Sequence, residues 1–155
     1  INIFERKIKS MKKTTDELMN NIKNVLSIED FFKDNKSEYF NITADQYLRK
    51  LLQEKDLKVS QIAVSSCLGN YVYKVFNGSR KANRDVYIAI GIAMKLTYNE
   101  LQLLLRLSKY LMLDPRDKRD SIFLYALSKQ LTVMETNDIL FSCNNEILGK
   151  ISEHK

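Results

Sequence analysis

We predict an all-α fold for this chain of 155 residues. First, helix starts are well marked, because a Thr that can accept backbone N–H groups is repeatedly followed three residues later by Glu or Gln. The clearest of these capping boxes begin at Thr14, Thr43, Thr97 and Thr132. Second, apolar residues recur after the caps at steps of three and four, and no segment alternates apolar and polar residues as a strand does.

The first 42 residues contain two short helical patterns, over 15–26 and 27–40. The second pattern is rich in aromatic residues, which most often pack in a core. We therefore expect core positions at Phe31, Phe32, Tyr39 and Phe40.

Five helices are expected in the middle of the chain. Three are amphipathic and span about 43–56, 83–94 and 97–107. Between the first and second of these there is room for only two short helices, 60–65 and 70–76, joined by residues 66–69. The inward positions of the short pair are Ile62, Ala63, Val72, Val75 and Phe76. Two short helices joined this tightly and flanked by longer ones describe a helix-turn-helix in a five-helix bundle.

After residue 110, the only proline, Pro115, lies in the charged connection "LDPRDKRD". This connection opens a helix through about Gln130, and a final helix follows over 132–143. We interpret "RDKRD" as a solvated first turn, with a partner or nucleic-acid contact as the alternative. We expect the tail 144–155 to be frayed. We recognise no internal repeat at the 30–45 residue spacing of helical solenoids.

The predicted organisation is therefore a helical extension over 1–42, a helix-turn-helix domain over 43–110 and a second helical extension over 111–155 that packs on this domain.

Composition and motifs argue against several protein classes. The apolar runs are far shorter than the ~18–20 residues of a membrane span, and "INIFERKIKS" has no export signal, so we expect a cytoplasmic protein. Cys67 and Cys143 are far apart and His154 is the only histidine, so we expect no metal site and two small buried thiols. Without a phosphate-binding loop, a nucleophile elbow or a dinucleotide fingerprint, we expect no catalytic residues, no cofactor and no enzyme.

The net charge of +6 is concentrated in the middle of the chain. Residues 43–96 carry 9 basic and 4 acidic side chains, whereas residues 1–42 carry 8 and 7, and residues 97–155 carry 8 and 8. A local excess of positive charge favours a polyanion as partner. Chance clustering of lysines is the alternative.

The run "LKVSQIAVSSCLGNYVYKVFNGSRKANRD" resembles the helix-turn-helix of phage lambda repressor and Cro and the related bacterial regulators of the XRE type. The matching features are Ser60-Gln61, Ala63, Leu68-Gly69, Phe76-Asn77-Gly78, the basic loop after them and the later helix ending in "KLTYNEL", and the resemblance covers about residues 43–107. It implies a lambda-repressor-like bundle, a recognition helix at about 70–76 and double-stranded DNA as ligand, bound by a homodimer. The spacing from Ala63 to Phe76 is one residue shorter than is usual in that family.

A recognition helix reads base edges near its N-terminus while flanking elements hold phosphates. Asn70 is the expected base reader, because an amide can pair with adenine. Tyr71 and Tyr73 are expected to contact phosphate or a thymine methyl group, and Lys74 guanine or the backbone. The remaining expected phosphate contacts are Ser60, Gln61, Ser79, Arg80 and Lys81, with Arg84 as a further candidate.

Two hypotheses for function remain open. The first is a sequence-specific DNA-binding transcriptional regulator whose terminal helices serve dimerisation or bind a protein partner. The second is a protein-interaction module, an adaptor or antagonist, that keeps the bundle but does not read DNA. The shortened spacing and the bulky Tyr71 and Tyr73 motivate the second hypothesis.

Overall fold

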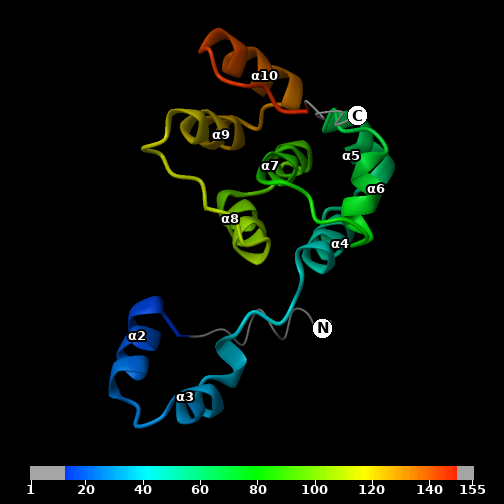
Figure 1. Cartoon of the computed structure of the whole chain (residues 1–155). Coiled ribbons are helices and arrows are strands. Elements are labelled where there is room, and N and C mark those ends of the chain that lie inside the picture. Colours follow the sequence, from blue (N-terminus) through cyan, green and yellow to red (C-terminus); the bar gives the residue numbers. More distant parts are fainter. Residues whose placement is uncertain (1–12, 150–155) are drawn as a thin grey trace. The chain divides into compact units, whose positions relative to one another are not determined.

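The computed structural model describes residues 13–149, and these residues form helices and no strand (Figure 1). The predicted all-α class is confirmed. The chain divides into two compact units, residues 1–42 and residues 43–155. The first unit contains α2 (Thr15–Asn24), α3 (Ile28–Asp34) and the 3₁₀ turn η1 (Lys36–Glu38). The second contains α4 (Ala44–Glu54), α5 (Val59–Ser65), α6 (Tyr71–Phe76), α7 (Arg84–Ala93), α8 (Tyr98–Leu107), α9 (Lys118–Lys129) and α10 (Val133–Ser142).

The first unit is a small helical hairpin held by a polar contact. Asn35 is 1% exposed, and its side chain donates to the Phe31 carbonyl at 3.0 Å and accepts from Lys13 Nζ at 2.6 Å. The bond from Asn35 stops α3 one turn after Phe31, so the helix predicted over 27–40 is divided into α3 and η1. Of the four aromatic residues predicted to form a core, only Phe31 is buried. That prediction is wrong for the other three, because a hairpin of this size encloses too little space.

Helix α7 lies at the centre of the second unit and packs against α5, α8, α9 and α10. Seven consecutive residues of α7 are buried, from Val86 to Ile92. Such a run is typical of a helix that other elements cover on every side. A Cβ atom at Gly91 would lie 2.7 Å from Leu101 Cδ1, so the close packing of α7 on α8 requires a glycine there.

Two ion pairs join the N-terminal ends of α7 and α9. Arg84 donates to both carboxylate oxygens of Asp120 at 2.9 and 2.8 Å, and Arg119 donates to both oxygens of Asp85 at 2.8 Å. The hydrogen bonds that Arg119 donates to Asp85 raise the pKa of Arg119 above its ordinary value, although burial opposes the shift. Asp120 is 5% exposed. The interpretation of "RDKRD" as a solvated first turn is therefore wrong for Arg119 and Asp120, which anchor α9 on α7, whereas the three residues before them, 116–118, are exposed.

The two hairpins α7–α8 and α9–α10 repeat each other at a spacing of 35 residues, which separates Arg84 from Arg119 and Asp85 from Asp120. The same spacing relates their second helices, each of which starts with a Thr–Glu capping box. It also relates the left-handed residues that end the helices, namely Lys95 with Gln130 and Lys109 with Asn144. The chain therefore contains an internal repeat, contrary to the expectation from sequence.

Each hairpin also holds the segment after its second helix in the same way. The Gln102 side chain donates to the Leu113 carbonyl at 3.0 Å and accepts from its N–H at 2.8 Å. Asn137, 35 residues later, binds Leu148 with the same two bonds at 2.9 and 2.7 Å. Leu148 is 2% exposed, so residues 144–149 are packed rather than frayed. The rest of the predicted frayed tail lies outside the described residues.

The reciprocal contacts have an approximate two-fold relation, because each hairpin gives an Arg to the Asp of the other. The equivalent residues Lys95 and Gln130 also meet, since Lys95 Nζ donates to the Gln130 carbonyl. The repeat was missed because the two hairpins differ at most other positions. Ile90 of α7, for example, is fully buried, whereas its equivalent Tyr125 of α9 is 51% exposed.

The contact between α7 and α9 predicts that two substitutions lower the free energy of unfolding by different amounts. Asp120→Ala leaves the half-buried Arg84 without its carboxylate and should lower the free energy of unfolding by about 3 kcal/mol. Asp85→Ala removes a carboxylate whose side chain is 36% exposed and should cost about 1 kcal/mol. Urea unfolding measures both values, and equal costs would contradict the assigned role of Asp120.

Candidate nucleic-acid interface

Helices α5 and α6 are joined by the tight connection 66–70 (Figure 1). The N–H of Gly69 donates to the Ala63 carbonyl at 3.0 Å, which turns the chain back on α5. Cys67 and Gly69 both adopt left-handed φ angles, 61° and 60°. Ser66 is fully buried and Leu68 is 4% exposed, so two buried side chains anchor the connection, while Cys67 and Gly69 face solvent.

The outer face of α6 carries two of the predicted DNA contacts. Its inner face consists of Val72, Val75 and Phe76, all buried. At about 100° per residue, Asn70 and Lys74 lie on the opposite face, one turn apart. Both side chains are exposed and form no hydrogen bond or ion pair within residues 13–149. They are therefore available to a ligand.

The two predicted tyrosines lie on opposite flanks of α6. Tyr71 is partly exposed, and Tyr73 is 44% exposed. Tyr73 lines a shallow groove of about 500 Å³ against α4, whose apolar walls include Leu52, Leu57 and Phe76. The structure thus brings Asn70 and Lys74 together on one face and turns Tyr73 towards a separate apolar surface.

The loop after α6 is held close to the helix end. Ser79 and Arg80 donate three local bonds: Ser79 N–H to Asn77 Oδ1 at 2.8 Å, Ser79 Oγ to the Lys74 carbonyl at 3.4 Å and Arg80 N–H to the same carbonyl at 3.2 Å. Gly78 has a φ of 78°, and a Cβ atom there would lie 2.7 Å from Asp45 Oδ2. Arg80 is exposed, and its side chain forms no hydrogen bond or ion pair within the described residues.

Lys81 and Arg84 have intramolecular partners instead. Lys81 Nζ lies 5.0 Å from the centre of the Tyr110 ring, and the Tyr110 hydroxyl donates to the Ala82 carbonyl at 2.7 Å. Arg84 binds Asp120 and the carbonyls of Leu111 and Met112. Arg80 is therefore the available cation of this loop, and Arg84 is engaged in holding the C-terminal hairpin.

The two candidates on α5 differ in their surroundings. Ser60 and Gln61 are both exposed in the first turn of the helix. Gln61 Oε1 accepts from the Lys58 N–H at 2.8 Å and so caps α5, whereas Ser60 has no side-chain bond within residues 13–149. Lys58 itself is exposed and was not among the predicted contacts.

A signal in the sequence could have identified Lys58. From Leu57 to Arg84 the chain contains five basic residues and no acidic one. Four of these, all except Arg84, are exposed on the short helices and their loops. This uninterrupted positive character gives the α5–α6 surface a favourable potential for a polyanion.

Both cysteines are exposed, so the expectation of buried thiols is wrong. Cys67 lies in the α5–α6 connection. Its left-handed backbone conformation turns the chain towards the core and leaves the Cys67 side chain outside it. A Cβ atom added to Gly149 would lie 3.4 Å from Cys67 Cβ, so the segment held by Asn137 ends against this connection. Cys143 follows the last turn of α10.

No protein-family model matches this chain, and searches of the curated proteins and of the solved structures found no match. Within residues 13–149, no helix has the length and apolar character needed to cross a membrane. The same residues contain no group of three or more His, Cys, Asp or Glu side chains that could hold a metal ion.

The exposed thiols predict a simple chemical result. Without denaturant, the folded chain should react with a thiol reagent such as dithionitrobenzoate at both Cys67 and Cys143, because both are exposed. The Cys67→Ser and Cys143→Ser variants should each release half as much chromophore. If reaction requires unfolding, the positions of both side chains are contradicted.

Proposed function

We propose that this chain is a sequence-specific DNA-binding transcriptional regulator of bacterial or phage type, a member of the XRE-type family that acts in the cytoplasm as a homodimer. Helix α6 is the recognition helix and docks in the major groove. Asn70 reads a base edge, Lys74 contacts guanine or phosphate, and Arg80 holds the backbone.

One observation carries this proposal. The outer face of α6 presents the side chains of Asn70 and Lys74 without a hydrogen-bond or ion-pair partner among residues 13–149, in a segment with five basic residues and no acidic one. An exposed amide and an exposed ammonium one turn apart on a short helix are the groups that hydrogen-bond base edges and phosphates. The buried residues Val72, Val75 and Phe76 fix the orientation of that face.

A second candidate function is the interaction module that does not read DNA. The observation that favours it is apolar surface beside the proposed site. Val64 on α5 is 81% exposed, and Tyr73 lines the groove with Leu52 and Leu57. Such a surface suits an apolar side chain of a protein partner better than a phosphate.

The test is DNA binding by the full chain, measured by fluorescence anisotropy on fragments of the flanking genomic DNA. Affinity should fall with salt with a log–log slope that corresponds to roughly four to eight phosphate contacts. The variant Lys74→Glu/Arg80→Glu should lose at least about tenfold in affinity and show a shallower slope, because two contacts become repulsive.

The matched control is Lys118→Glu/Lys129→Glu, which changes the net charge equally at exposed lysines of α9. It should bind within about threefold of the unchanged chain, since non-specific charge effects are screened beyond ~10 Å. If the unchanged chain binds no DNA at low salt, the proposal fails and the interaction module is favoured. If the two variants lose affinity equally, α6 is not the reading element.

A further inference from the structure

The hairpin formed by residues 13–42 lacks a core of its own. Helix α2 buries no side chain, and among the described residues of this unit only Phe31 and Asn35 are buried. Units of fewer than about 40 residues usually need a disulfide, a metal ion or an associated chain to be stable. Neither cysteine of the sequence lies in this unit.

The same hairpin exposes large apolar side chains on both of its arms. On and after α2 these are Met19, Ile22 and Leu26, with exposed fractions of 46%, 44% and 100%. On α3 and after η1 they include Ile28, Phe32 and Tyr39, with exposed fractions of 49%, 50% and 41%.

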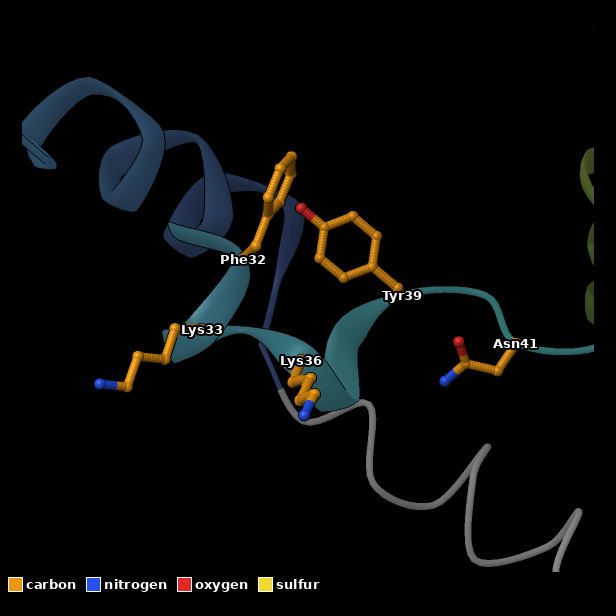
Figure 2. A pocket seen from close by; sticks show the side chains of 5 residues that line it. All are labelled: Phe32, Lys33, Lys36, Tyr39 and Asn41. Carbon is orange, nitrogen blue, oxygen red and sulfur yellow. The ribbon is translucent and has the colours of Figure 1, made fainter. Parts of the chain in front are cut away.

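Two of these side chains belong to a shallow pocket. Figure 2 shows the rings of Phe32 and Tyr39 turned towards each other, with a centroid distance of 5.9 Å. The pocket has a volume of about 540 Å³, and Lys33, Lys36 and Asn41 complete its lining. An apolar side chain of a partner could pack against the two rings while the lysines remain at the edge.

The exposed area is close to what a dimer requires. If each of the six side chains offers ~150–200 Å² when fully exposed, their exposed fractions amount to about 600 Å². A standard interface covers about 800 Å² on each partner. The hairpin therefore supplies most of one side of such an interface.

The charges of the hairpin are self-complementary. Helix α2 has Asp16 and Glu17 in its first turn and Lys23 in its last turn. Helix α3 repeats this order with Glu29 and Asp30 before Lys33. In a two-fold pairing whose axis is perpendicular to these helices, equivalent helices run antiparallel, and the acidic end of each lies beside the basic end of the other. A second copy fits this layout better than a partner of a single charge sign.

We propose that the hairpin of residues 13–42 is the self-association surface of this protein, and that its occupant is the same hairpin of a second copy. The exposed apolar side chains of the two hairpins form a shared core, which neither hairpin builds alone. This proposal does not depend on DNA binding, although it would bring two recognition helices into one particle.

The experiment measures the mass of the full chain by sedimentation equilibrium without DNA, over a range of concentrations. The unchanged chain should be a dimer with twice the 18.1 kDa chain mass. The variant Ile22→Asp/Leu26→Asp should be monomeric at the same concentrations, with a dissociation constant raised at least about 100-fold, because two desolvated charges oppose association. Phe32→Asp alone should weaken the dimer in the same direction.

The matched control is Leu111→Asp/Phe141→Asp, which alters two apolar side chains of the second unit that are 83% and 77% exposed. It should remain a dimer, and circular dichroism should show unchanged helix content in all variants. A monomeric unchanged chain overturns the proposal, even if that chain binds DNA. A dimer that survives both hairpin variants but not the control also overturns it and assigns the interface to residues 43–155.

Discussion

The burial of seven consecutive residues of α7 is the constraint on which the second unit depends. This run, from Val86 to Ile92, is covered by α5, α8, α9 and α10, so α5 and the C-terminal hairpin are packed against the same element. Gly91 allows α8 to approach, and the paired Arg84–Asp120 and Arg119–Asp85 contacts fix α9 at the end of α7. Loss of this helix would remove the common support of both halves of the unit.

This arrangement also determines which charges remain available on the surface. Arg84 and Lys81 are adjacent to the proposed interface, but Asp120 and Tyr110 engage them. Within the described part of the chain, the side chains of Asn70, Lys74 and Arg80 have no such partners, and they face solvent on α6 and its loop. The segment 57–84, which contains no acidic residue, therefore carries two kinds of polar side chain. Some are cations that have partners within the fold, and the others are polar groups that a nucleic acid could use. The proposed function depends on this second set.

Local signals in the sequence predicted the helices well. The capping boxes at Thr14, Thr43, Thr97 and Thr132 are all formed, because a cap needs only residues within one turn. Contacts between distant residues were not predictable in this way. The ion pairs of "RDKRD", the binding of Leu148 by Asn137 and the partner of Lys81 each join residues 11 or more positions apart. Of the predicted site, the exposure of Asn70 and Lys74 follows from helical spacing, whereas the position of Tyr73 in a groove depends on α4.

DNA recognition by α6 is tested most directly by an amide ¹H–¹⁵N NMR titration of the full chain with a short DNA duplex at low salt. The largest chemical-shift changes should occur at Asn70, Lys74 and Arg80, while α9 and α10 change little. Changes confined to the α9–α10 hairpin or to residues 13–42, or no change at all, would contradict the assignment of α6 as the element that reads DNA.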